Sequence, residues 1–247
     1  MSGPIVVDVG NTRIKWGLCS SAHVWSVAPL PAEDTDAWQQ QWREWKLERG
    51  QEWIVAGVHP PRRDALVAWL KERSDSVVVL STFKELPLQI DVEVPHKVGI
   101  DRLLNAVAAN RHRQEHVAAI LVDAGSAVTV DYVDGNGVFK GGAIFPGFGL
   151  MARSLHEHTA LLPIVTLDEA ALPPGTSTTH AIQAGVLHAV VGGVERLIAE
   201  YQLRFPTAFE IFITGGDAKL VAGKLHRSAH IWPEMTLEGI LHARTVT

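Results

Sequence analysis

Two short stretches of the sequence carry an aspartate, a glycine and a small polar residue at a turn between apolar runs. The first, VVDVGNTRIKWGL, spans residues 6–18, and the second, LVDAGSAVTVDYV, spans residues 121–133. They align without a gap at an offset of 115 residues. The aligned pairs are Asp8 with Asp123, Gly10 with Gly125, and Asn11 with Ser126. Two copies at this distance indicate a duplicated half-domain, not a solenoid.

A hairpin of this form has the groups that bind phosphate. Glycine lets the backbone turn and lets a ligand approach the amide groups, and a small polar side chain can donate to phosphate oxygens. An aspartate at the strand end can hold a metal ion that neutralises a polyphosphate. A single Asp-x-Gly is common in ordinary turns, so the inference depends on the pair. Two such hairpins facing one cleft would hold the phosphates of one nucleotide from both sides.

A further carboxylate, Asp101, lies in the segment VGIDR, residues 98–102. The segment opens an expected helix from near Gly99, whose apolar face is formed by Ile100, Leu103, Leu104, Val107 and Ala108. Asp101 falls in the first turn, where the helix dipole favours a carboxylate. It could also position a substrate hydroxyl and accept its proton. From the residues alone, the ordinary helix-terminal charge, with Arg102 as a solvated neighbour, is favoured.

Other nucleotide and metal motifs are absent from the sequence. There is no G-x-x-x-x-G-K-[ST] loop, and no G-x-G-x-x-G follows a strand. The glycine-rich GGAIFPGFGL is interpreted either as a strand end before a helix that starts after Pro146, or as a substrate loop. None of the twelve histidines follows a zinc-binding pattern, so no zinc site is expected.

The elements that would position these residues alternate between strands and helices, which favours an α/β fold with parallel pairing. Strands are expected at residues 4–10, 13–20, 23–28, 52–58, 76–81, 116–125, 127–133, 137–145 and 209–216. Helices are expected at residues 34–48, 62–73, from 99 onward, after 146, and at 180–202. Trp38, Trp42 and Trp45 recur at helical spacing, which predicts core packing and not a ligand box. The boundary between halves is expected near residues 113–116.

Composition limits the class of protein. The chain has 247 residues, 47% hydrophobic and 20% charged, which is typical of a globular protein of one large or two small domains. The formal charge of −5 predicts no nucleic-acid partner and no attraction to an anionic membrane. No run approaches the ~20 apolar residues of a membrane span, and the N-terminus has no signal-peptide pattern. Cys19 is the only cysteine, and a cytoplasmic location is expected.

The paired hairpins resemble the two phosphate motifs of the superfamily of acetate and sugar kinases, heat-shock chaperones and actin. Within it, the chain is similar to type III pantothenate kinases, a group that includes Bvg accessory factors. The motifs that carry the resemblance are DVGNTRIKWG (8–17), VGIDR (98–102), DAGSAVT (123–129), GGAIFPG (141–147) and FITGGDA (212–218). The resemblance implies two duplicated actin-like (ribonuclease H-like) half-domains, 1–114 and 115–247, with a nucleotide cleft between them.

The resemblance also implies roles for single residues. Asp101 would be the catalytic base, Asp123 would bind a monovalent cation (K⁺ or NH₄⁺), and Asp8 would lie near Mg²⁺. The ATP-binding residues would be Asp8, Val9, Gly10, Asn11, Thr12, Arg13, Ile14, Lys15, Ser126, Gly215 and Gly216. The pantothenate-binding residues would be Val92, Gly99, Ile100, Asp101, Arg102 and Thr178. Val92 stands where the family often has an aromatic residue, which implies that the wall of the substrate pocket differs from that of the family at this position.

The activity implied is transfer of the γ-phosphoryl group of ATP to the primary hydroxyl of pantothenate, the first step of coenzyme A synthesis. The resemblance further implies a homodimer with the substrate near the subunit interface. Two alternatives stay open at this point. One is another small-molecule kinase of the superfamily, and the other is a non-catalytic regulator that binds nucleotide as a signal.

Overall fold

A computed structural model of the chain describes residues 3–73 and 76–243, and these form two compact units. Of these residues, the first unit contains those up to His112, residues 137–139 and residues 234–243. The second contains residues 113–136 and 140–233. The chain therefore first passes from one unit to the other after His112, two residues before the expected boundary at 114/115.

The first unit is built on a five-stranded sheet in the order β3-β2-β1-β4-β5. Its strands are β1 (Ile5–Val9), β2 (Arg13–Cys19), β3 (Val24–Pro31), β4 (Glu52–Gly57) and β5 (Ser76–Leu80). β1 pairs antiparallel with β2 and parallel with β4, and β4 pairs parallel with β5. β2 and β3 form a second antiparallel pair. The sheet is thus mixed, with a meander on one side and parallel strands on the other.

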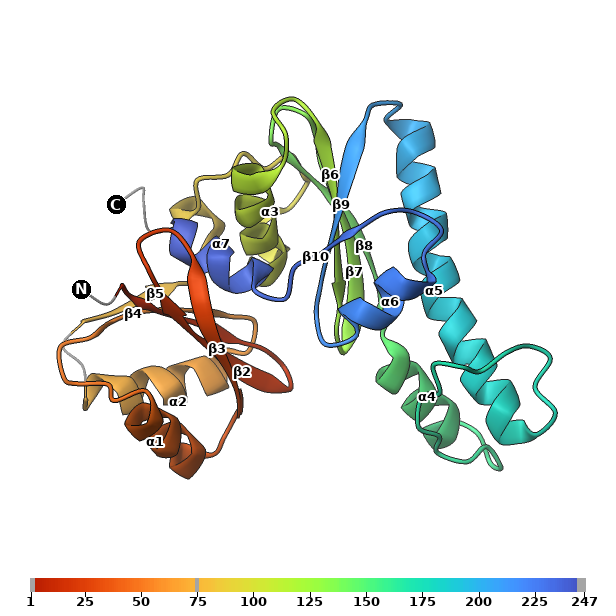
Figure 1. The fold of residues 1–247 in the computed structure, drawn as a ribbon, viewed down its shortest axis with the longest axis horizontal. Helices are drawn as coiled ribbons and strands as arrows, with labels where there is room; N and C mark the ends of the chain where they lie inside the picture. Colours follow the sequence, from red (N-terminus) through yellow and green to blue (C-terminus); the bar gives the residue numbers. More distant parts are fainter. Residues whose placement is uncertain (1–2, 74–75, 244–247) are drawn as a thin grey trace. The chain divides into compact units, whose positions relative to one another are not determined.

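Helices cover both faces of this sheet, with α1 and α2 on one face and α3 and α7 on the other (Figure 1). They are α1 (Thr35–Glu44), α2 (Pro60–Lys71), α3 (Ile100–His112) and α7 (Met235–Ala243). Two short 3₁₀ turns, Phe83–Glu85 and Pro95–Lys97, lie between β5 and α3. The expected helix at 34–48 ends earlier, at Glu44, because Lys46 takes a positive φ of 51°.

The core between the sheet and α1 and α2 is rich in tryptophan. Trp38 and Trp42 of α1 are buried, as their spacing predicted, and Trp42 stacks on Trp53 of β4 with ring centroids 5.7 Å apart. Trp16 of β2 meets Trp53 in a T-shaped, edge-to-face contact with ring centroids 4.9 Å apart. Aromatic pairs of this kind add to the stabilisation from area burial. The tryptophans therefore serve packing, which confirms the interpretation of the Trp38–Trp45 stripe.

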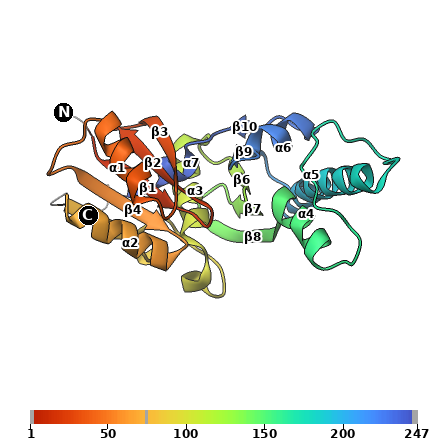
Figure 2. The ribbon, with the colours of Figure 1, turned by 90° about the horizontal axis from the view of Figure 1, so that it is seen from below.

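The second unit repeats the plan with a sheet in the order β10-β9-β6-β7-β8. Its strands are β6 (Ala118–Ala124), β7 (Ala127–Val133), β8 (Phe139–Pro146), β9 (Phe209–Thr214) and β10 (His230–Ile231). Its helices are α4 (Phe148–Glu157), α5 (Thr178–Arg204) and α6 (Ala218–Lys224). α5 packs against β7 and α6 against β6, β9 and β10 (Figure 2).

α5 is long and apolar enough, by length and composition, to cross a membrane, but half of its most apolar window is buried inside the protein. Its buried side chains, Ile182, Val190, Val194 and Ile198 among them, belong to the core of the second unit. The length and hydropathy of α5 are therefore explained by its place in that core.

The two sheets match strand for strand, which confirms the predicted α/β class with duplicated halves. β6 corresponds to β1, β7 to β2 and β9 to β4, with the same antiparallel and parallel pairings. The gapless alignment at offset 115 fails beyond the turn, however. Val9 pairs with Ile14 in the first hairpin, whereas Ala124 pairs with Val128 in the second, so the second turn is one residue shorter.

One element lies in a different unit from the one predicted. α7 falls in the sequence range assigned to the second half, but it packs in the first unit against α3 and β1. Its side chains are buried almost throughout, and Gly239 lies against the backbone of Leu104 in α3. Any larger residue at 239 would collide with that backbone, so the glycine permits the close helix approach.

Candidate functional site

The first hairpin presents a carboxylate and an ammonium group side by side. Asp8 is the penultimate residue of β1 and lies directly opposite Lys15 of β2. Directly opposed residues of antiparallel strands project from the same face, with Cβ atoms about 4.5–5.5 Å apart. Both residues are partly exposed. The turn between the strands is closed by the Gly10 N–H, which donates to the Arg13 carbonyl at 3.0 Å.

The other predicted residues of this turn divide into two groups. Asn11, Thr12 and Arg13 are exposed, so they lie at the surface of the protein. Val9 and Ile14 are fully buried in the core, so only their backbone groups can take part in binding.

An arginine that the sequence did not single out holds this turn in place. Arg62, in the first turn of α2, donates from Nη1 to the carbonyl of Asn11 and from Nε to Glu33 at 2.8 Å. This contact holds the pKa of Glu33 below its usual range. Arg62 lies far from the turn in sequence and belongs to no local motif, so only the fold shows its contact.

The predicted base, Asp101, is held at the start of α3. Its Oδ1 accepts a hydrogen bond from the backbone N–H of Arg102 at 2.8 Å. A Cβ on Gly99 would lie 2.5 Å from the same oxygen, so the carboxylate folds back over a position that only glycine leaves open. Burial raises the pKa of Asp101, while the Arg102 N–H and charge oppose the shift. A carboxylate with a raised pKa is a stronger proton acceptor, as a general base requires.

Phe139 contacts both Arg102 of the G-x-D-R segment and the chain just before Val92. The guanidinium of Arg102 lies over the Phe139 ring, 5.7 Å from its centroid. Phe139 in turn forms a β-bridge with Ile90, and its carbonyl accepts from the N–H of Asp91 at 2.9 Å. Val92 follows directly after Asp91, so the backbone of Phe139 runs beside the segment that carries the predicted substrate residue. Phe139 comes from a distant strand, and the sequence reasoning missed it.

A cavity of about 480 Å³ adjoins Gly99 and Ile100 in the first unit. Its wall also contains Gly57 and Val58 from the end of β4, and Val58 packs near Gly99. Three basic residues line it as well: Arg63, Lys84 and His96. The cavity therefore combines apolar walls with positive charge, which suits a small organic anion. The buried side chain of Ile100 forms part of this wall.

The second hairpin carries the predicted cation ligand, Asp123, directly opposite Thr129 of β7. The Oγ1 atom of Thr129 is buried and has no hydrogen-bond partner among the described residues. Because the strands are paired at this point, the carboxylate and the hydroxyl project from one face of the sheet. Two oxygen ligands, one of them otherwise unsatisfied, fit the coordination chemistry of a hard cation.

Glycines crowd around this second hairpin. Gly215, with φ at 96°, follows β9, and a Cβ there would lie 2.6 Å from Asp123 Oδ1 and collide with the Ala124 carbonyl. Gly147 donates to the carbonyl of Ser126 at 3.0 Å. The predicted residues Asp123, Ser126, Gly215 and Gly216 are therefore gathered in one place in the second unit. No atom lies within 4 Å of a Cβ built on Gly216, so a ligand has room there.

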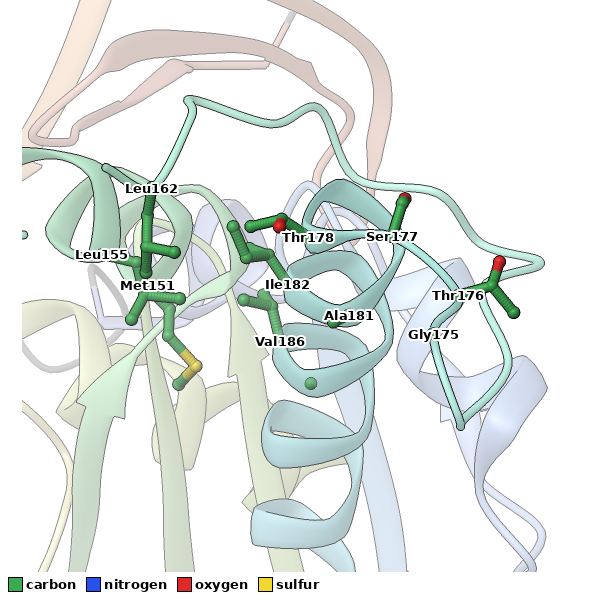
Figure 3. Close-up of a pocket in the computed structure, with 11 residues that line it drawn as sticks. Met151, Leu155, Leu162, Gly175, Thr176, Ser177, Thr178, Ala181, Ile182 and Val186 are labelled. Carbon is green, nitrogen blue, oxygen red and sulfur yellow. The ribbon is translucent and has the colours of Figure 1, made fainter.

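Thr178 lies in the second unit, at the first turn of α5. It lines an apolar pocket of about 820 Å³ between α4 and the start of α5, with Met151, Leu155 and Ile182 in its wall (Figure 3). Ser177 caps α5 by accepting from the N–H of His180 at 3.2 Å. Thr178 belongs to the second unit, whereas the other predicted pantothenate residues, Val92 and 99–102, belong to the first.

Solved structures of other proteins show the same fold. A conserved putative Baf family transcriptional activator from Campylobacter jejuni superposes with a TM-score of 0.60 at 20% identity, over 97% of this chain and 96% of its own. An activator of the 2-hydroxyisocaproyl-CoA dehydratase from Clostridium difficile, with bound ADPNP, gives a TM-score of 0.54 at 12% identity, over 98% and 92% of the two chains. At these identities the likeness concerns the fold alone.

Sequence comparisons go further. The model of the type III pantothenate kinase family matches residues 4–200. The type III pantothenate kinase of Acidiphilium cryptum is 33% identical over 96% of this chain and 92% of its own length. That of Akkermansia muciniphila is also 33% identical, over 96% of both chains. A match of this extent, on a fold that carries both hairpins and the G-x-D-R segment, makes this chain a member of the type III pantothenate kinase family.

Proposed function

We propose that this protein transfers the γ-phosphoryl group of ATP to the primary hydroxyl of pantothenate. Family membership supports the reaction, and the setting of Asp101 is the observation that carries the role of a base. Its carboxylate is fixed at the start of α3 by the Arg102 N–H, and burial raises its pKa. A group so placed would orient the substrate hydroxyl and accept its proton as phosphoryl transfer proceeds.

The two hairpins would hold the nucleotide. Kinases of this family use ATP with a divalent ion, and Asp8 offers a partly exposed carboxylate oxygen of the kind that Mg²⁺ prefers. Lys15, directly opposite Asp8, would neutralise phosphate charge. A likeness in fold to a protein whose structure contains ADPNP supports nucleotide binding. In this proposal Gly215 and Gly216 would lie beside the adenosine.

We assign the monovalent cation to Asp123 and Thr129. The unsatisfied Thr129 hydroxyl beside the Asp123 carboxylate supports this site. The role of K⁺ or NH₄⁺ would be to neutralise phosphate charge near Ser126, whose hydroxyl would contact the phosphates.

The basic cavity beside Gly99 is proposed to receive the pantothenate carboxylate. Arg63, Lys84 and His96 surround a volume of about 480 Å³, within the range of small-molecule sites. Arg102 and Val92 would contact the rest of the substrate, with Phe139 packing beneath Arg102.

A homodimer is proposed from the apolar surface around Thr178. Leu161 is 91% exposed and Leu172 is 74% exposed, on the segment that lies between α4 and α5. Exposed large apolar side chains beside an apolar pocket are typical of an interaction surface. A second copy of the chain would cover them. Light scattering on the purified protein tests this assembly, and a monomer at micromolar concentration would refute it.

The decisive experiment measures ADP release with pantothenate against a panel of other small alcohols. The proposal predicts turnover that depends on pantothenate and is absent without it. A different acceptor would identify another small-molecule kinase, and binding of ATP without turnover of any acceptor would identify a regulator. Lys15→Ala should weaken ATP binding in calorimetry, whereas Lys71→Ala, an exposed lysine of α2, should not.

A further inference from the structure

α3 packs against α7 in the first unit (Figure 1). Three side chains outside the proposed ATP and pantothenate sites converge between these two helices. His112 is the last residue of α3, and Glu238 and His242 are one turn apart on α7. Residues at i and i+4 share one helix face, so both α7 side chains project together. One ligand atom from each of the three residues lies within 4.8 Å of the others.

The spacing of these atoms suits a metal ion. His112 Nε2 lies 3.1 Å from Glu238 Oε2, and the ring centroids of His112 and His242 are 6.3 Å apart. Nitrogen and oxygen ligands of tetrahedral zinc lie at about 2.0–2.2 Å from the ion, which separates donor atoms by about 3.3 Å. One pair already meets this separation, and side-chain rotation would bring the third donor within reach.

The ligands are carried by elements that are fixed against each other. The Thr236 hydroxyl donates to Asn105 Oδ1 at 2.8 Å in the buried contact between α7 and α3. Gly239 lies against the backbone of Leu104 in the same contact. A site built on packed helices keeps its geometry without the ion, which favours binding because little order must be gained.

Burial and charge at the cluster also fit a metal. The side chain of Glu238 is only 8% exposed, and a buried carboxylate needs a counter-charge. The His112 side chain is 37% exposed, which leaves an entry path and room for a water ligand.

We propose that His112, Glu238 and His242 form a binding site for a divalent transition-metal ion, zinc in the first place, with the fourth position open to water. Two imidazoles and one carboxylate favour zinc or cobalt over Mg²⁺, which prefers oxygen ligands alone. The ion would bind α7 to the end of α3, the helix whose first turn contains Asp101. The sequence predicted no zinc site because His112 is separated from the α7 pair by more than a hundred residues.

The test uses the full-length protein without a polyhistidine tag, stripped with chelator and titrated with zinc in a calorimeter. We expect one zinc per chain by elemental analysis and a rise of several degrees in Tm. His242→Ala and Glu238→Gln should each weaken zinc binding about tenfold or more. Glu238→Gln is the sharper variant, because glutamine keeps the shape and the hydrogen bond to His112 but is a poor metal ligand.

His226→Ala is the matched control. His226 contacts Glu195 at 2.6 Å in an exposed histidine–glutamate pair outside the cluster, so its loss should leave zinc binding unchanged. Cobalt provides a readout independent of stability, since tetrahedral Co²⁺ has intense visible absorption that should vanish in Glu238→Gln. The proposal is overturned if the wild type binds no zinc, or if Glu238→Gln binds zinc and cobalt as the wild type does. In either case the three residues form only an ion-pair cluster.

Discussion

The Oδ1 atom of Asp101 lies 2.5 Å from the position that a Cβ atom on Gly99 would occupy. The carboxylate of Asp101 can therefore keep its position only while residue 99 is glycine. Gly99→Ala should force the carboxylate to rotate away from its hydrogen bond with the Arg102 N–H. A misplacement of about 1 Å at a reacting group costs on the order of 10²-fold in rate. We therefore expect kcat with pantothenate to fall by about that factor.

The matched control for this substitution is Gly192→Ala in α5, where nothing lies within 4 Å of an added Cβ. It should leave kcat unchanged and stabilise the protein by about 0.5–1 kcal/mol, as alanine does in a helix interior. Steady-state rates and thermal melts of both variants decide the matter. If Gly99→Ala turned over like the wild type, the position of Asp101 would not matter for catalysis.

Asp101→Asn removes the ability to accept a proton but keeps the size and the acceptor oxygen of the side chain. General-base catalysis contributes about 10²–10⁴-fold, so kcat should fall within that range. Calorimetric affinity for ATP should stay unchanged, because the phosphates would be held by the hairpins at Gly10 and Gly125. A rate within a few-fold of wild type would show that Asp101 is not the base.

The same variant should also change how stability depends on pH. Burial raises the pKa of Asp101 in the folded protein above 3.8, so the folded state holds its proton more tightly than the unfolded state. The wild type therefore loses stability, relative to Asp101→Asn, as pH rises from about 4 through the raised pKa. Between pH 4.5 and 8, the melting temperature of Asp101→Asn should rise relative to that of the wild type as pH increases. A constant difference across that range would contradict the raised pKa.

Thr129→Val tests the cation site without changing side-chain volume. If the Thr129 hydroxyl and Asp123 bind the ion together, the variant should need about tenfold more K⁺ for half-maximal activity. The wild type should be far more active in K⁺ or NH₄⁺ than in Na⁺ at matched ionic strength. Thr166→Val, at an exposed threonine, serves as the control. Equal activity in all three salts would remove the cation from the proposal.

Arg62→Ala should weaken ATP binding without abolishing turnover. Arg62 donates to the Asn11 carbonyl and so fixes the turn of the first hairpin, but its partner Glu33 is largely exposed to solvent. We expect KM for ATP to rise about threefold to tenfold, with a smaller change in kcat. Arg43→Ala removes an equal charge from the exposed end of α1 and should change neither constant. A fall in kcat alone would indicate that Arg62 acts on the chemical step instead.

The sequence predicts the residues of this protein that lie in local motifs. The hairpins at Asp8 and Asp123 and the helix that begins at the G-x-D-R segment are visible in it, because strand and helix periodicities and turn residues are local. The α/β class was predicted from the alternation of strands and helices and the duplication from the repeated hairpin, and the two matching sheets confirm both. The facing of Asp8 and Asp123 across one cleft stays a prediction.

What the sequence could not predict arises from contacts between distant segments. Arg62 at Asn11, Phe139 beneath Arg102 and the cluster of His112 with α7 each join residues that no local pattern connects. The one-residue difference between the hairpin turns was also missed, because both strands contain apolar residues in either register. The structural counterpart of Lys15 is therefore Thr129 and not Val130.

The position of α7 in the first unit has a consequence for synthesis on the ribosome. The first sheet and α3 emerge early, but the helix that covers Leu104 and Asn105 is made only after residue 233. Domains commonly fold in the order in which they are translated. Here the second unit can complete its core while the first still exposes the apolar face of α3. That apolar face therefore stays uncovered until α7 has been made.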